Sequence, residues 1–331
     1  MISTSNEIAT KLSYRLFKES DLEKVLELWE KYSGWGLITA QQFHEWHMNT
    51  PYGDCMIIVV EDIVDGVIGQ MVFVPSKVYI DGVEKDSYRV MAPIIKNDFR
   101  EFNIKHFDHP VYAMFRFGIK EAKKNDHNVI YFLPSIGWIA TVKTFPKYGL
   151  PEASIALNDC LRIKLNIDNS FFNNSLEKYY VQPGNYGKEY DQLWEDAVTS
   201  LSIKCAVARH AKWLEWKRAP HLLFEMRNKS NHQLIGYIVI KKDSGLVIDL
   251  LARSIEEMEI VVRLTLEHLG QNNANDQQQI FTEIKLMQTS LINSVISSIP
   301  HDKIDFRFAF VHFSLYQQLD DNKEWFIMPD D

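Results

Sequence analysis

Cysteine is scarce in this sequence, long apolar runs are lacking, and positive charge is not in excess. The three cysteines, Cys55, Cys160 and Cys205, are odd in number and far apart. Such spacing suits neither a disulfide framework nor a metal site, so we expect buried free thiols in a reducing compartment. No stretch approaches the ~18 apolar residues of a membrane-spanning helix. The polar segment 1–11 has no signal-peptide core. We therefore predict a cytoplasmic protein with no membrane partner.

The charge balance is acidic: 36 Lys and Arg residues stand against 44 Asp and Glu residues, which gives a net charge of −8. No run of basic residues forms the electrostatic footprint that phosphate-backbone binding needs, so we expect no nucleic-acid partner. Hydrophobic residues make up 46% of the 331 residues, which is ordinary for a globular protein with complete cores. The length corresponds to about two domains of ~150 residues each.

One pattern occurs twice, about half a chain length apart. It consists of a Leu-Trp-Glu helix, an aromatic-rich helix, a proline, an apolar strand, a turn and a strand that carries Ile-Gly. The first copy lies at 28–30, 43–46, 51, 56–60 and 68–69, and the second at 193–195, 213–216, 220, 222–226 and 235–236. A repeat of this length predicts two copies of one fold, because the units of a solenoid are far shorter.

Hydrophobic periodicity and turn residues predict the elements of each half. In the first half we expect strands at 13–17, 55–61, 67–79, 87–95, 129–133, 153–157 and 161–165, and helices from Ser20, at 39–48, 110–124 and 136–147. In the second half we expect strands at 222–226, 234–241, 246–251, 280–286, 306–313 and 325–328, helices at 190–201, 206–216, from Ser254 and at 289–299, and a polar loop at 272–279. Ser20 with Glu23 and Ser254 with Glu257 have capping-box spacing.

A three-strand meander followed by a crossover helix predicts an α/β fold, a mixed sheet with helices on both faces. The element order of each half resembles the GNAT superfamily of N-acyltransferases, and the doubling resembles its tandem members. The resemblance implies two tandem GNAT-like domains, 1–166 with the acyl-CoA loop and 167–331 with a structural or substrate-shaping role. It also implies acyl transfer from acetyl-CoA or another acyl-CoA to a small-molecule amine.

The resemblance places the acyl-CoA loop after the fourth strand. The family has Arg-Gly-x-Gly there, or Gln for Arg, because glycine N–H groups at a helix N-terminus bind a pyrophosphate. Here Arg100 occupies the arginine position, but Glu101 and Asn103 replace both glycines. Asn103 can still adopt a left-handed conformation, whereas Glu101 adds a negative charge that disfavours a like-charged ligand. One interpretation is a variant acyl-CoA loop; the other is a solvated loop on a scaffold that has lost the cofactor.

If the loop still binds acyl-CoA, the resemblance implies a definite set of cofactor-binding residues. These are Ile95, Lys96, Arg100, Phe102, Asn103 and Ile104. In the second half the corresponding connection, 252–254, is too short to surround a diphosphate, and Ser254 is expected to serve as a helix cap.

A second family signature is Tyr-x-x-x-Gly-aromatic, in which the tyrosine protonates the departing thiolate. Phe145 occupies the tyrosine position here and has no proton to donate. Tyr148, directly before Gly149, remains the candidate for catalysis; the alternative is an aromatic that packs at a helix end. Loss of a general acid typically costs about 10²–10⁴ in rate, so activity is weakened rather than abolished.

Other polar clusters give less specific signals. His44 and His47 lie too close for zincin spacing and lack an evident third ligand, so we expect no metal. His106, Asp108 and His109 could supply a base or a substrate contact, or cap the next helix in solvent. We expect the tryptophans at 46, 213 and 216 to lie in the core.

Two alternatives to an acyltransferase follow from the same residues. The missing glycines and the missing tyrosine favour a non-catalytic GNAT-like module that binds a metabolite or a protein partner. A FemAB-like aminoacyl transferase also has a doubled fold and needs no CoA, but it needs a basic surface for tRNA. The net charge of −8 opposes that third interpretation.

Overall fold

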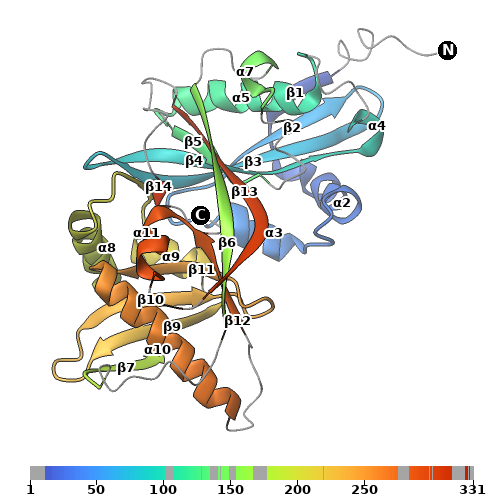
Figure 1. The fold of residues 1–331 in the computed structure, drawn as a ribbon. Coiled ribbons are helices and arrows are strands. Elements are labelled where there is room, and N and C mark those ends of the chain that lie inside the picture. The colour runs from blue at the N-terminus through green and yellow to red at the C-terminus, as the bar shows by residue number, and fades with distance from the viewer. Residues whose placement is uncertain are drawn as a thin grey trace. The chain divides into compact units, whose positions relative to one another are not determined.

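The computed structural model divides into two compact units, each with its own core (Figure 1). The residues that it describes are 12–100, 107–127, 129–134, 141, 143–148, 154–166, 177–218, 220–274, 283–297, 299, 301–314, 325, 326 and 328. The first unit comprises 1–78, 85–158 and 309–322, and the second comprises 79–84, 159–308 and 323–331.

The first unit is built on a mixed sheet. Its strands lie in the order β1 (Leu12–Leu16), β2 (Met56–Asp62), β3 (Gly66–Ile80), β4 (Val83–Ile95) and β5 (Val129–Phe132). Pairing is antiparallel from β1 to β2 and from β2 to β3, and parallel between β4 and β5. The helices are η1 (Glu19–Asp21), α2 (Leu22–Tyr32), α3 (Ala40–His47), α4 (Asn97–Arg100), α5 (Pro110–Lys124) and α7 (Phe145–Tyr148). The predicted mixed α/β architecture is confirmed.

Helix α5 has the predicted bounds, and its sequence explains them. Pro110 occupies the first helical turn, where its missing N–H removes no intrahelical bond. Val111, Met114, Phe115 and Ile119 follow a helical period and are buried in one cluster with β2 and β3. Gly118 permits this packing, because a Cβ there would lie 2.2 Å from the ring of Phe73.

The second unit repeats this strand order in a separate sheet, β11-β10-β9-β7. The strands are β7 (Tyr179–Pro183), β9 (Leu222–Asn228), β10 (Leu234–Ile240) and β11 (Val247–Ala252). The other elements are α8 (Lys188–Ser200), β8 (Cys205–Val207), α9 (Ala211–Arg218), α10 (Ile255–Ala274), β12 (Glu283–Gln288), α11 (Ser290–Val295) and β14 (Trp325–Phe326). Figure 1 shows α10, in orange, along one face of this sheet.

The two Ile-Gly dipeptides occupy equivalent strands. Gly69 lies in β3 and Gly236 in β10, each the middle strand of a three-strand meander. A Cβ on Gly69 would lie 2.8 Å from the carbonyl oxygen of Ile94, and one on Gly236 would lie 2.7 Å from that of Leu251. Each glycine therefore allows close approach of the third strand near its C-terminal end. The repeat seen in the sequence corresponds to a repeated structural contact.

Two long strands contribute residues to both units. Strand β6 (Ser154–Asn166) pairs with β12 from Leu161 onward, and β13 (Asp302–Ser314) pairs with β5 from Val311 onward. The resulting order is β5-β13-β6-β12. Each half of the chain thus pairs its last long strand with a strand of the other half, within one sheet. The boundary expected after residue 166 falls at the end of β6, while the compact units divide β6 after residue 158.

Several local predictions need correction. Residues 153–157 and 161–165 were expected to form two strands, but β6 is one continuous strand between β13 and β12 in the sheet. The capping box at Ser20 is wrong: Asp21 takes that role, accepting hydrogen bonds from the Lys18 N–H at 2.8 Å and from Arg15 at 2.7 Å. Trp46 is 42% exposed rather than in the core.

Other predictions are confirmed or fall outside the described part. Cys55 and Cys205 are buried free thiols, and Trp213 is buried. The Ser254 hydroxyl accepts a hydrogen bond from the Glu257 N–H at 3.1 Å, as the capping spacing predicts. The side chain of Cys160, most of the helix expected at 136–147, the loop at 275–279 and the strand start at 280–282 lie outside the described residues.

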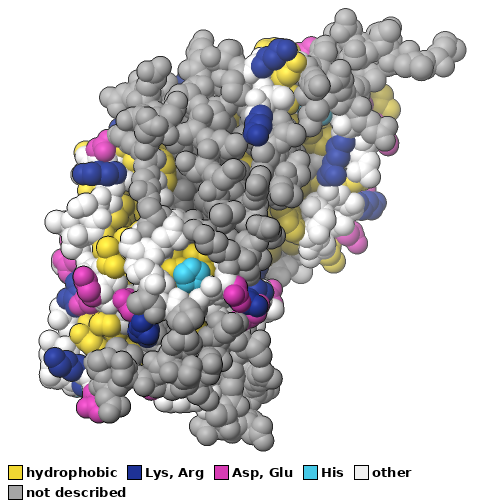
Figure 2. Space-filling model, in the orientation of Figure 1, with side chains coloured by type: hydrophobic (Ala, Val, Ile, Leu, Met, Phe, Trp, Pro, Cys, Tyr) yellow, Lys and Arg dark blue, Asp and Glu magenta, His cyan; other side chains and the backbone are white. Residues whose placement is uncertain are grey.

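The described surface is mixed in charge. On the face that Figure 2 shows, Lys and Arg side chains alternate with Asp and Glu side chains and with hydrophobic ones. Among the helices that the structure describes, none combines the length and the apolar composition needed to cross a bilayer.

Candidate functional site

Strand β4 extends beyond the residues that pair with β5, and the candidate site lies at this extended end. The parallel pairs run from Ser87 with Val129 to Arg89 with Tyr131, whereas β4 continues to Ile95. Its far end remains attached to β3, because the Lys96 N–H donates to the Ile68 carbonyl at 2.9 Å. The C-terminal part of β4 therefore lies beyond the described residues that pair with β5.

Ala92 marks a local distortion in this part of β4. Its φ is 50°, in the left-handed region, and its side chain is buried. A left-handed alanine costs roughly 1–2 kcal/mol, and such distortions recur as bulges beside active sites. The distortion reorients the backbone of β4 just before it reaches a cavity.

A cavity of about 310 Å³ adjoins the end of β4. It is formed by the end of α2 with its following loop, the end of β4, α4 and the start of α5. The lining residues are Tyr32, Ser33, Trp35, Pro93, Ile94, Ile95, Arg100, His109, Val111 and Thr141. A largely apolar wall with two basic side chains is typical of small-molecule sites. All these residues belong to the first unit.

Arg100 holds two walls of this cavity together. Its Nε donates to the Ile95 carbonyl at 2.8 Å, and its Nη2 donates to the Tyr32 carbonyl at 2.5 Å. These bonds join the C-terminal end of α2 to the end of β4. Two of the five guanidinium N–H groups are therefore committed to the backbone.

His109 caps α5 at the opposite wall. Its Nδ1 accepts a hydrogen bond from the Val111 N–H at 3.3 Å, and only 4% of the residue is exposed. Burial lowers the pKa of His109, and the nearby Arg100 carbonyl opposes this shift only in part. The histidine is a cap, one of the two roles expected for its cluster, but it is buried rather than solvated.

The start of α5 offers little to a diphosphate. Pro110 has no N–H, and the N–H of Val111 already donates to the ring of His109. In a helix N-terminus that binds anions, these groups would be free to face the ligand.

The predicted cofactor-binding residues are only partly brought together. Ile95 and Arg100 line the cavity. Lys96 does not, and its Nζ lies 3.4 Å from the Asp65 carbonyl oxygen. Phe102, Asn103 and Ile104 lie outside the described residues, as does Glu101.

Tyr148 packs where α7 meets α5. Its ring centroid lies 5.8 Å from that of Tyr112, and its carbonyl accepts a hydrogen bond from Arg116 at 2.7 Å. It is absent from the cavity lining. The Tyr112 hydroxyl is hydrogen-bonded to the Thr144 hydroxyl, and burial raises the pKa of Tyr112. The side chain of Phe145 lies outside the described part.

The wall of the cavity that follows α2 was not predicted from the sequence. Trp35 lines the cavity and is 64% exposed, and its flanking glycines, Gly34 and Gly36, have φ of 78° and 89°. Trp35 also lies 5.4 Å from the ring of Trp29. The Gly-Trp-Gly sequence was the available signal, because glycines that permit positive φ on both sides of an aromatic indicate a shaped loop.

The expected absence of a metal concerns His44 and His47. His44 Nε2 pairs with Glu19 at 3.1 Å, and His47 is buried with its Nδ1 2.8 Å from the Phe43 carbonyl oxygen. Within the described ranges, no three His, Cys, Asp or Glu side chains are grouped to hold a metal ion.

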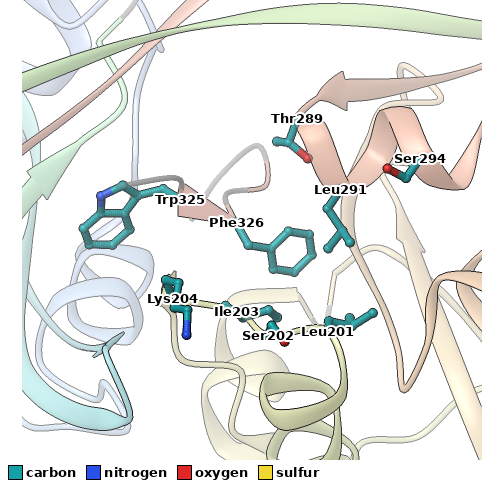
Figure 3. Close-up of a pocket in the computed structure, with 9 residues that line it drawn as sticks. All are labelled: Leu201, Ser202, Ile203, Lys204, Thr289, Leu291, Ser294, Trp325 and Phe326. Carbon is teal, nitrogen blue, oxygen red and sulfur yellow. The ribbon is translucent and has the colours of Figure 1, made fainter. Parts of the chain in front are cut away.

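In the second unit, buried ionic groups surround the corresponding strand. Asp249 in β11 is fully buried, 3.0 Å from Arg209 Nε and 3.5 Å from Arg218 Nε. A cavity of about 260 Å³ lies elsewhere in this unit (Figure 3). Its lining residues are Leu201, Ser202, Ile203, Lys204, Thr289, Leu291, Ser294, Trp325 and Phe326. Figure 3 shows the Phe326 ring directed toward Leu291.

Comparisons with known proteins define the fold. The sequence matches no protein-family model, and no curated protein matches it. A GCN5-related N-acetyltransferase from Anabaena variabilis is similar in structure, with a TM-score of 0.66 and 11% identity over 91% of this chain and 72% of that one. A probable N-acyltransferase of unknown function from Enterococcus faecalis gives a TM-score of 0.63 and 9% identity, over 90% and 72%.

A third similar structure is the N-myristoyltransferase of Saccharomyces cerevisiae with bound myristoyl-CoA. Its TM-score is 0.55 at 9% identity, over 95% of this chain and 84% of that one. At such identities the likeness concerns the fold alone. The chain has the mixed α/β fold of the GCN5-related N-acetyltransferases.

Proposed function

We propose that the first unit binds an acyl-CoA thioester at the end of β4 and transfers the acyl group to a small amine. The observation that carries this proposal is the end of β4, which continues past its described pairs with β5 and contains left-handed Ala92, beside the cavity. A strand edge without a β-sheet partner can donate its N–H groups to a ligand. Such preorganised donors stabilise the oxyanion that develops when a nucleophile attacks a carbonyl.

The reaction needs little from side chains. The amine nitrogen attacks the thioester carbon, the C–N bond forms, the C–S bond breaks to release the CoA thiolate, and the amine loses a proton to solvent or to that thiolate. A thiolate is a good leaving group, so a side-chain acid is helpful but not required. The packing of Tyr148 outside the cavity wall is consistent with transfer that does not use it.

The similar structures support an acyl-CoA donor. The yeast N-myristoyltransferase holds myristoyl-CoA, and the Anabaena protein is named an N-acetyltransferase. These donors share the CoA portion and differ in acyl length. We therefore place CoA, rather than a particular acyl chain, at the centre of the proposal.

Calorimetric titration with desulfo-CoA tests the binding step. We expect saturable binding with one site per chain. Turnover is then measured as free-thiol release from acetyl-, octanoyl- and myristoyl-CoA with a panel of small amines. Release that depends on both the amine and the protein supports transfer, and the preferred acyl length follows from the relative rates.

A non-catalytic binding module is the second candidate. It is favoured by the first turn of α5, where Pro110 lacks an N–H and the N–H of Val111 is already used. If desulfo-CoA does not bind and no acyl-CoA is consumed, this candidate replaces the acyltransferase.

A further inference from the structure

His109 presents a buried polar atom at the wall of the first-unit cavity. The residue is only 4% exposed and lines the cavity together with Val111 and Ile95. Its Nε2 makes no hydrogen bond of normal geometry with any part of the chain that the structure describes, and the nearby Arg100 carbonyl only partly offsets the effect of burial on the ring's pKa. A buried polar atom without a partner is costly, and a bound ligand that supplies the partner offsets this cost.

The cap bond determines which ring nitrogen carries the proton. Because the Val111 N–H donates to Nδ1, that nitrogen must hold a lone pair. Burial disfavours the charged imidazolium. The ring is therefore neutral, with its proton on Nε2, and it can donate one hydrogen bond on the side away from the cap.

The Nε2–H donor compensates for the free backbone N–H groups that the start of α5 lacks. Pro110 has no N–H, and the N–H of Val111 is turned to the histidine ring. The cap thus uses one donor of the helix, while the ring keeps another donor, on Nε2, in a residue that lines the cavity. Only an acceptor atom satisfies an N–H donor, so the matching ligand group is a phosphate oxygen or a carbonyl oxygen.

We propose that His109 is a binding residue for the acyl donor, and that its Nε2–H donates a hydrogen bond to an acceptor oxygen of CoA. This inference rests on the proposed function, since it assumes that CoA occupies the cavity. CoA offers two sources of such an oxygen, the diphosphate and the amide carbonyls of the pantetheine arm. Separate titrations with ADP and with pantetheine distinguish them.

The test uses variants that separate capping from donation. His109→Ser keeps an N-cap acceptor but removes the imidazole N–H, and His109→Ala removes both. Thr39→Ala is the matched control, because Thr39 caps α3 by accepting from the Gln42 N–H at 3.1 Å and is not a cavity residue. Each full-length variant is titrated with desulfo-CoA, ADP and pantetheine, and its thermal unfolding is recorded.

We expect His109→Ser to bind desulfo-CoA about 10-fold more weakly than wild type, which corresponds to ~1.4 kcal/mol, with an unchanged melting temperature. His109→Ala should lose the same affinity and also melt earlier, whereas Thr39→Ala should melt earlier and bind normally. The smaller ligand whose affinity also falls contains the acceptor. If His109→Ser binds like wild type, the inference is wrong although the proposed function stands. If wild type binds no CoA, both are wrong.

A measurement on wild type does not depend on the folding of the variants. In protein labelled with ¹⁵N-histidine, the His109 ring is assigned through its proximity to the Val111 amide. We expect a protonated Nε2 and an unprotonated Nδ1, and a shift of the Nε2–H resonance when desulfo-CoA is added. A proton on Nδ1, or an Nε2–H signal that CoA leaves unmoved, overturns the inference.

Discussion

Two histidines of the first unit are buried against the backbone of their own helices. His47 Nδ1 lies 2.8 Å from the Phe43 carbonyl oxygen in α3, and His109 accepts from the Val111 N–H at the start of α5. Burial lowers the pKa of both residues, that of His47 to about 4. A neutral histidine therefore costs less to bury here than a charged one, and acidification works against the folded state.

His47→Gln tests this linkage. The unfolded chain binds a proton at His47 below about pH 6.5, whereas the folded chain binds it only near a pKa of about 4. Between these values the free energy of unfolding must fall as the pH falls, by about 3 kcal/mol in all. Glutamine cannot titrate but can still donate to the Phe43 carbonyl. Urea unfolding from pH 7 to pH 4.5 should therefore show a shallower loss of stability in the variant. Parallel profiles for variant and wild type would contradict the assignment.

Substitutions of Glu101 and Asn103 test whether the loop after Arg100 contacts the cofactor. Replacing both with glycine restores positive-φ freedom and removes a charge that repels phosphate, so affinity for desulfo-CoA should rise several-fold. The single variant Glu101→Gln removes the charge alone and should recover part of the gain. The measurement is calorimetric titration of each variant. If the double-glycine variant binds no better than wild type, this loop does not contact the cofactor.

The sequence predicted some of the cavity residues but not the whole wall. Arg100 and Ile95, which line the cavity, could be found because the resemblance to the GNAT superfamily places the acyl-CoA loop directly after the fourth strand. Tyr32 and Trp35 could not, because their place at the cavity depends on how the end of α2 meets β4. Their position at the cavity depends on tertiary contacts, such as the hydrogen bond from Arg100 to the Tyr32 carbonyl.

At the scale of elements, the β2-β3-β4 and β9-β10-β11 meanders each contain a glycine at which two strand backbones lie close together. The surroundings of these two contacts differ. Gly69 brings β3 close to Ile94, which lines the cavity, whereas Gly236 brings β10 close to Leu251, which lies within a filled core. The same local geometry therefore supports an open site in one unit and packing in the other.

Gly69→Ala and Gly236→Ala form a matched pair. In each, the new Cβ would lie under 3 Å from a strand carbonyl oxygen, so each should lower the free energy of unfolding by about 1–3 kcal/mol. Only Gly69→Ala should also weaken desulfo-CoA binding, since it displaces Ile94 and Ile95 at the cavity wall. Thermal unfolding and calorimetry measure both effects. Equal loss of binding in the two variants would show that the first-unit meander has no special role.

The tip of the β3-β4 hairpin, residues 79–84, forms contacts whose contribution to stability should depend on pH. The His210 Nε2 lies 2.8 Å from Glu84, its Nδ1 lies 3.5 Å from Asp191, and Asp81 N–H donates to the Lys204 carbonyl at 2.9 Å. The hydrogen bond to Glu84 is the main cause that raises the pKa of His210. When it is protonated, His210 joins the hairpin tip to α8 and α9 by ion pairs.

His210→Gln should remove this pH-dependent contribution. Because the folded pKa is raised, the stabilisation is fully present below the unfolded value of about 6.5 and is lost as the pH rises through the folded pKa. Wild type should therefore lose more stability than His210→Gln when urea unfolding is compared at pH 6 and pH 8.5. His47→Gln, whose effect lies on the acidic side, is the control. An identical loss in wild type and His210→Gln would rule out a charged His210.

At the scale of the whole molecule, the repeat was visible in the sequence but the exchange of strands was not. Matched helices, prolines and glycines marked two copies, since those residues shape local structure. Strands β6 and β13 are adjacent in one sheet, each next to a strand of the other half of the chain. Their partners are chosen by pairing across long sequence separations, such as Val311 with Phe132 and Leu161 with Gln288. Such non-local contacts are the ones that periodicity and turn residues do not encode.

The exchange predicts that residues 1–166 do not form a stable unit by themselves. The strand between β5 and β6 is then missing, because it is supplied by the end of β13. We expect a 1–166 chain to show poor amide dispersion in NMR spectra and rapid proteolysis, because β5 is left as an unpaired edge. Adding a peptide of residues 302–322 in trans should restore dispersion and protease resistance. The same peptide with Val311→Pro and Phe313→Pro should fail, because proline cannot donate to the ladder. Cooperative folding of 1–166 without any peptide would contradict the observed strand order.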